Sequence, residues 1–117
     1  MRWCLALLLM TGLASAQERA QAAPGAVLRA LDKITGETTD IEIGRGQLAR
    51  YGFLQIILGE CRFPEGNPNS DAFALIEVRD NRQEQPVFVG WMVASSPALN
   101  AMDHPRYDVW VLRCKRS

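Results

Sequence analysis

Short runs of alternating hydrophobic and polar residues recur along this chain from residue 26 almost to its end. A period of two residues places successive side chains on opposite sides of the backbone and therefore predicts β-strands. The segments with this pattern cover residues 26–34, 38–43, 53–61, 72–80, 86–95 and 107–115. Short strands separated by turn-forming residues predict a mainly β fold of six or seven strands. We expect a small antiparallel β-sandwich or barrel with one short helix in the last long connection.

The alternation also predicts which side chains share a face. In the segment 72–80 one face carries Ala72, Ala74, Ile76 and Val78, and the other carries Phe73, Leu75 and Glu77. In the segment 107–115 one face carries Tyr107, Val109, Val111 and Arg113, and the other carries Asp108, Trp110, Leu112 and Cys114. The run 53–61 is apolar on one face and mostly apolar on the other, which is typical of a central strand that runs to Cys61.

The connection before the last predicted strand contains the signals of a short helix. Ser95 or Ser96 can cap a helix whose first residue is Pro97, a position that proline favours. The letters "PALNAMD" give about two turns, which place Leu99 and Met102 on one face. The next proline ends the helix, because it has no amide hydrogen to continue the hydrogen-bond pattern.

The first 16 residues are organised like a secretory signal peptide. Arg2 precedes the apolar run "WCLALLLMTGLASA", whose last three residues, 14–16, form an A-x-A cleavage pattern with Gln17 as the first mature residue. The run is shorter than the roughly 20 apolar residues that span a bilayer, although a retained anchor stays open as an alternative. Residues 17–25 have few large apolar side chains and predict a flexible leader, so we expect a single β domain over residues 26–116.

The charge balance argues against a nucleic-acid partner. The chain carries 13 basic and 13 acidic residues, and no run of lysine or arginine exceeds two. The basic face that a nucleic-acid-binding protein needs is therefore missing. Once the signal peptide is removed, we also expect no transmembrane segment.

The cysteines predict a disulfide bond. Removal of the signal peptide takes Cys4 with it and leaves Cys61 and Cys114, and an even pair in an exported protein favours a disulfide. The bond would close a loop of about 50 residues, which is worth roughly 4 kcal/mol in chain entropy. A free pair and half of a metal site are the alternatives. Since a structural zinc ion is coordinated by four ligands and His104 is the only histidine, we expect no metal and no cofactor.

His104 is the candidate for catalysis, because a histidine is ready to transfer protons near neutral pH. With Asp103 and Asp108, and with Ser95 or Ser96 nearby in the sequence, it could form the centre of a small envelope hydrolase. The same two aspartates would give it a weak metal site. The other interpretation is structural: Ser96 caps the helix, and His104 binds a backbone carbonyl to fix the connection. The absence of a strong catalytic motif favours this second interpretation.

The two tryptophans nearest the end of the chain, Trp91 and Trp110, lie on the strands that flank this connection. Large aromatic side chains usually fill the core of a small domain, but a connection of about 12 residues is long enough to be typical of a functional loop. We therefore predict a binding surface made of Trp91, Asp103, His104, Tyr107 and Trp110. The favoured function is a non-catalytic β domain that binds or supports a cell-envelope partner, either a protein or a glycan. A purely structural accessory role stays open.

The block "GWMVASSPALNAMDHPRYDVWVLRC", together with "LDKITGETTDIEI" and Cys61, resembles the exported alphaproteobacterial family known as domain of unknown function 2155. The resemblance covers about residues 25–115. The positions that match the residues recurring in the family are Gly90, Trp91, Met92, Ser95, Ser96, Pro97, Ala98, Leu99, Asn100, His104, Pro105, Tyr107, Asp108, Trp110 and Cys114. The resemblance implies a signal peptide, two cysteines and a periplasmic location in a Gram-negative bacterium, and it supplies no activity.

Overall fold

The structure, a computed structural model, describes residues 19–116, so the predicted signal peptide over residues 1–16 lies outside the described residues. Within them the chain forms eight strands and one turn of 3-10 helix. These elements are β1 (Ala20–Ala23), β2 (Gly25–Asp32), β3 (Thr38–Gly44), β4 (Leu48–Tyr51), β5 (Leu54–Pro64), β6 (Phe73–Asp80), β7 (Phe88–Val93), η1 (Pro97–Leu99) and β8 (Tyr107–Lys115).

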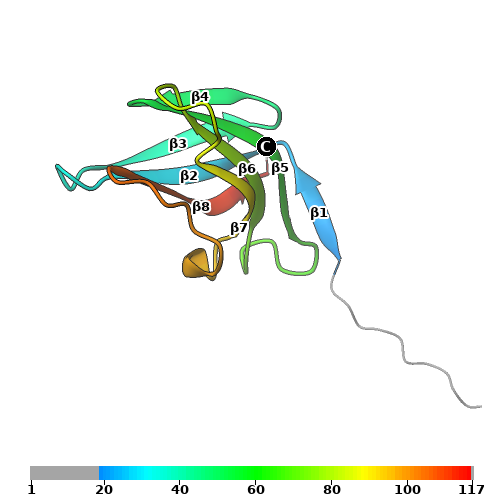
Figure 1. Cartoon of the computed structure of the whole chain (residues 1–117). Helices are drawn as coiled ribbons and strands as arrows, with labels where there is room; N and C mark the ends of the chain where they lie inside the picture. Colours follow the sequence, from blue (N-terminus) through cyan, green and yellow to red (C-terminus); the bar gives the residue numbers. More distant parts are fainter. Residues whose placement is uncertain (1–18, 117) are drawn as a thin grey trace, which may run out of the picture.

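The strands form two antiparallel sheets that are stacked as two layers (Figure 1). In the first sheet the order is β1-β5-β6-β7, and β4 pairs with the half of β5 that β1 does not reach. In the second sheet the order is β3-β2-β8. The predicted mainly β, sandwich-like fold is confirmed. Because β7 and β8 each end a sheet instead of pairing with each other, the sheets do not close into a barrel.

The core lies between the two sheets and follows the predicted alternation. Along β6 every second residue is buried, and these are Ala74, Ile76, Val78 and Asp80. The inner face of β5 starts with Leu54, Ile56 and Leu58, and that of β8 starts with Tyr107, Val109 and Val111. Burial of a full-sized aliphatic side chain stabilises the fold by roughly 1.5–3 kcal/mol, so these positions hold the layers together.

Two β-bulges decide where the cysteines point. Gly59 has no partner on β6, because Leu58 and Glu60 pair with the consecutive residues Ile76 and Leu75. Similarly, Leu112 has no partner on β2, since Val111 and Arg113 pair with consecutive residues of that strand. An extra residue shifts the period-two alternation by one position. Cys61 and Cys114 therefore turn inward, and the simple alternation was wrong to place Cys114 on the face opposite Val111.

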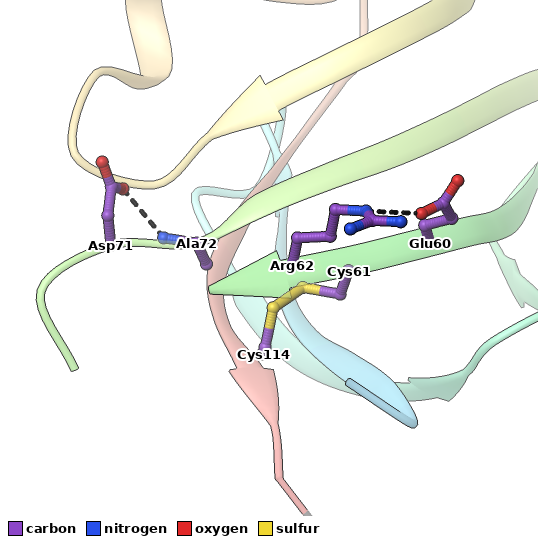
Figure 2. The surroundings of a disulfide bond; sticks show 6 residues. All are labelled: Glu60, Cys61, Arg62, Asp71, Ala72 and Cys114. Atoms are coloured by element: carbon purple, nitrogen blue, oxygen red, sulfur yellow. Dashed lines mark hydrogen bonds and ion pairs between the residues drawn. A yellow bond between two sulfur atoms is a disulfide. The ribbon is translucent and has the colours of Figure 1, made fainter. Parts of the chain in front are cut away.

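The predicted disulfide is present and joins the two layers. It links Cys61 of β5 to Cys114 of β8, with 5.7 Å between the Cα atoms and a sequence separation of 53 residues. Figure 2 shows the Cys61 side chain reaching across to Cys114, while the ion pair between Glu60 and Arg62 lies on the other face of β5. The bond therefore fixes the spacing of the sheets at one end of the sandwich.

The prediction of a flexible leader over residues 17–25 is wrong for residues 20–23, which form β1. This strand lies beside the end of β5 (Figure 1). The register runs from Ala20 opposite Pro64 to Ala23 opposite Cys61. Backbone hydrogen bonds hold β1 in place, and only Ala23 buries its side chain. A segment of small residues can therefore be a strand even though it lacks the large apolar residues that signal one.

The predicted two-turn helix is also wrong, because only the single turn η1 forms. Its preceding residue, Ser96, makes no capping hydrogen bond, and Asn100 after it is already extended. Since the chain straightens there, Leu99 and Met102 do not share a face. Leu99 is 75% exposed, whereas Met102 is 8% exposed and packs in the core.

We predict that replacing Cys61 and Cys114 together by alanine lowers the free energy of unfolding by about 4 kcal/mol, because the unfolded chain regains the entropy of the open loop. Urea denaturation monitored by fluorescence measures the loss. The wild type in a thiol reductant should unfold like the variant, and the variant should not respond to the reductant. Equal stability of the oxidised wild type and the variant would contradict this role of the bond.

Candidate functional site

The connection from β7 to β8 covers the open side of the sandwich. In Figure 1 it leaves β7, makes the η1 turn and returns to the start of β8. Most of its side chains are exposed, but Met102 and His104 are 8% and 2% exposed. Met102 belongs to the hydrophobic core, so the connection closes part of that core.

The buried carboxylate of Asp80 binds the connection through His104. It is the last residue of β6 and lies on the inner face, next in the alternation after Val78, with 0% exposure. The backbone amide of Arg82 donates to its Oδ1 at 2.9 Å, and the Arg82 guanidinium donates to both oxygens at 3.0 and 2.7 Å. His104 Nε2 lies 2.9 Å from its Oδ2. A buried charge is tolerated where it is paired and hydrogen-bonded in this way.

The ring of His104 is held by contacts at both nitrogens. The backbone amides of Arg106 and Tyr107 donate to Nδ1 at 3.0 and 3.1 Å. An amide nitrogen is a donor here, so Nδ1 is unprotonated and the ring hydrogen sits on Nε2, from which it is donated to Asp80. Tyr107 stacks on the ring, with 5.4 Å between the centroids. Neither nitrogen is left to act on a substrate.

This arrangement differs from both sequence interpretations of His104. The carboxylate that it contacts belongs to Asp80, 24 residues away, and not to Asp103 or Asp108. Asp103 is exposed, and the carboxylate of Asp108 accepts from the amide of Val109 at 2.9 Å. The structural interpretation also had the wrong partner, because His104 binds two backbone amides and a carboxylate where a backbone carbonyl was expected.

The hydrogen-bond partners of Asp80 lower the pKa of its carboxyl group. Hydrogen bonds from Arg82 and from His104 hold the pKa of its carboxyl well below the ordinary range and outweigh desolvation, which acts in the opposite direction. Arg82 in turn stacks over the ring of Phe53, with the guanidinium carbon 4.1 Å from the centroid. The half-exposed arginine therefore closes the buried pair off from solvent.

Further contacts anchor the end of the connection beside β8. The guanidinium of Arg106 donates to Asp32 at 3.0–3.3 Å, and the amide of Lys33 donates to the carbonyl of Arg106 at 2.7 Å. Tyr107 packs edge-on against Tyr51, with 5.2 Å between the ring centroids. Its hydroxyl lies against Gly52, which has a φ of 57°, so a Cβ at this position would collide with it.

Different contacts anchor the end beside β7. The amide and hydroxyl of Ser95 donate to the carboxylate of Asp71 at 2.9 and 2.7 Å, and Asp71 also accepts from the amide of Ala72 (Figure 2). Asn100 donates to the carbonyl of Trp91 at 2.8 Å and so covers part of the exposed edge of β7. Ser95 is thus an anchor and neither caps a helix nor lies in a hydrogen bond with His104.

The fixed connection encloses a pocket between the two edge strands. Its volume is about 340 Å³. Its lining includes Met92 and Val93 from β7, Ala98 from η1, and Asp108, Val109 and Trp110 from β8. Apart from Asp108 and Asn100, the residues that line it are apolar or aromatic. A concave, largely apolar site with a few polar groups is the usual form of a ligand pocket.

The structure separates the five predicted binding residues into two groups. Trp91 is 39% exposed on the outside of β7, Asp103 is exposed, and Trp110 is half-buried in the pocket wall. His104 and Tyr107 are buried, at 2% and 4% exposure, and hold the connection from inside. Only Trp91, Asp103 and Trp110 are therefore accessible enough for a direct contact, whereas His104 and Tyr107 are not.

Within residues 19–116 no cluster of three or more histidine, cysteine, aspartate or glutamate side chains is arranged to hold a metal ion. The same part of the chain contains no helix whose length and hydrophobicity would let it cross a membrane.

We predict that Asp80→Asn lowers the free energy of unfolding at pH 7 by about 3 kcal/mol, the scale on which breaking a buried ion pair destabilises proteins. Because the folded-state pKa of Asp80 is depressed, its contribution to the wild-type stability is present above the unfolded pKa of about 3.9 and is lost progressively as the pH falls below that value. The variant should show a shallower loss in this window. Urea denaturation from pH 2 to 7 measures both, with Glu84→Gln, an exposed carboxylate on the same turn, as the control. Parallel pH profiles of wild type and Asp80→Asn would contradict the assignment.

One comparison with known proteins identifies the family of the chain, and a second finds a relative. A family model described as "Uncharacterized protein conserved in bacteria (DUF2155)" matches residues 26–114. The chain is also 32% identical over 88 residues to the uncharacterized protein RP359 of Rickettsia prowazekii, which covers 73% of this chain and 57% of that protein. No solved structure matches the chain significantly. The matched region contains nearly all of β2 and of β8 and every element between them, and the chain therefore belongs to the bacterial family of domain of unknown function 2155.

Proposed function

We propose that this protein is an exported, non-catalytic β domain that binds or supports a cell-envelope partner through the pocket between β7 and β8. The observation that carries the proposal is the pocket of about 340 Å³, which the anchored connection encloses between the edge strands. Trp91 lies on the outside of the same strand that supplies Met92 and Val93 to its wall. Exposed aromatic side chains beside an apolar cavity are common features of protein-binding surfaces.

The contacts of His104 support a non-catalytic role. A general base needs a free nitrogen within hydrogen-bond reach of the group that it activates, and both ring nitrogens are engaged within the protein. One of the two candidate nucleophiles in the predicted hydrolase, Ser95, donates its hydroxyl hydrogen bond to Asp71. No contact among the described residues favours the hydrolase alternative over the binding function.

Two features support the export of the protein. The pattern of the first 16 residues is that of a signal peptide, and a disulfide joins the two sheets. Structural disulfides persist in oxidising compartments such as the bacterial periplasm and are rare in the cytosol. The periplasm of a Gram-negative bacterium is therefore the proposed location.

The family and the relative do not identify a partner. The family description and RP359 are both uncharacterized, and the chain spans about 57% of the length of RP359. The proposed function consequently rests on the site and not on a transferred activity.

Photocrosslinking in intact cells tests the proposal. The photoreactive residue benzoylphenylalanine replaces Ala98 in the pocket wall or, as the matched control, Leu48, which is 45% exposed on β4. We predict a discrete adduct with the probe at position 98, none with the probe at position 48, and loss of the adduct when Trp110→Ala is added. The tagged chain should fractionate with the periplasm and start at Gln17.

An equal pattern of adducts at positions 98 and 48, or none at position 98, would favour a purely structural accessory role. Recovery of the chain from the cytoplasm alone would contradict the proposed location.

A further inference from the structure

The pocket contains one carboxylate that has no basic partner. Asp108 lies in the lining, and between residues 19 and 116 no lysine or arginine forms an ion pair with it. Its Oδ1 accepts from the Val109 amide at 2.9 Å, so the carboxylate is held in position while its second oxygen has no recorded hydrogen bond within this part of the chain. Asp108 is the one carboxylate among the residues that line the pocket.

The remainder of the lining has a different character. Met92 and Val93 come from one strand and Val109 and Trp110 from the other, and the volume of about 340 Å³ lies at the lower end of the range for ligand pockets. A ligand that fits must therefore place a slender apolar part against these side chains and a positive charge at Asp108. An indole ring also attracts a cation through its electron-rich face, and Trp110 is the residue two positions after Asp108 on β8.

A lysine or arginine side chain has this combination of an aliphatic stem and a cationic end. The place of the pocket favours a peptide over a free amine, because β8 is the terminal strand of its sheet in the described part of the chain. An extended segment can bind next to such an edge and direct alternate side chains toward the protein. The edge of β7 is less available, since Asn100 already occupies the carbonyl of Trp91.

We propose that the pocket binds a lysine or arginine side chain of an extended segment in the envelope partner, with the stem along Val93 and Ala98 and the charge at Asp108 and Trp110. This inference rests on the proposed function and specifies its partner chemistry. Charge complementarity selects the occupant, because a neutral side chain in the pocket would cover the half-buried carboxylate of Asp108 without pairing with it, and an acidic side chain would repel it.

Nuclear magnetic resonance titration of the oxidised, ¹⁵N-labelled protein tests this chemistry. The probes are acetylated and amidated pentapeptides Ala-Val-X-Val-Ala, in which X is lysine, arginine, norleucine or glutamate, together with pentylamine as a free amine. We expect the lysine and arginine peptides to shift the amide signals of Met92, Ala98 and Val109, and to bind about tenfold more tightly than the norleucine peptide. Asp108→Asn should remove that preference, whereas Glu65→Gln, an exposed carboxylate outside the lining, should retain it.

Equal affinities for lysine and norleucine, an unchanged preference in Asp108→Asn, or no shifts at millimolar peptide would overturn the inference. Pentylamine binding as tightly as the lysine peptide would identify a small amine as the ligand and would also overturn it. If the inference fails while the crosslink at position 98 is still lost in Trp110→Ala, the proposed function stands and only the chemistry of its partner is wrong. The spectrum of Asp108→Asn without peptide shows whether the variant is folded.

Discussion

The hydrogen bond between His104 and Asp80 is the interaction on which the open side of this sandwich depends. Asp80 ends β6 in one sheet, and His104 belongs to the connection that leads into β8 in the other. At the opposite end of the core the disulfide between Cys61 and Cys114 joins the same two sheets. The layers are therefore fixed at both ends, covalently at one and by a buried charge-assisted hydrogen bond at the other. A small domain with few residues to bury gains specificity from such fixed points.

The same interaction connects the fold to the proposed function. With His104 held inside, the chain from residue 94 to residue 106 must run across the gap between β7 and β8, where it forms the outer wall of the pocket. The histidine that looks like a catalytic residue in the sequence thus acts on the surface only by fixing the position of its own connection. Binding is left to side chains on the edge strands, namely the exposed Trp91 and the pocket residues Asp108 and Trp110.

Much of the fold follows from the sequence, because the period-two alternation reports burial directly. It predicts the main strands, the inner face of β6 and the importance of the last long connection. The bulges at Gly59 and Leu112 could not be predicted this way, since each shifts the register through one unpaired residue. The burial of Asp80 could have been predicted, because extending the alternation of Ala74, Ile76 and Val78 by one step places its side chain inside. Its pairing with His104 could not have been predicted, because a contact between residues 24 positions apart depends on how the sheets stack. The pocket likewise arises from packing, and of its lining the sequence predicted only Trp110 as a binding residue.

The protonation of the His104 ring tests the central claim most directly. Long-range ¹H–¹⁵N correlation spectra at neutral pH distinguish the two ring nitrogens and show which one carries the hydrogen. The contacts with Asp80 on one side and with the amides of Arg106 and Tyr107 on the other predict a single tautomer with the hydrogen on Nε2 and none on Nδ1. A hydrogen on Nδ1, or averaging between the two tautomers, would contradict the account, since the ring would then not hold the connection to β6.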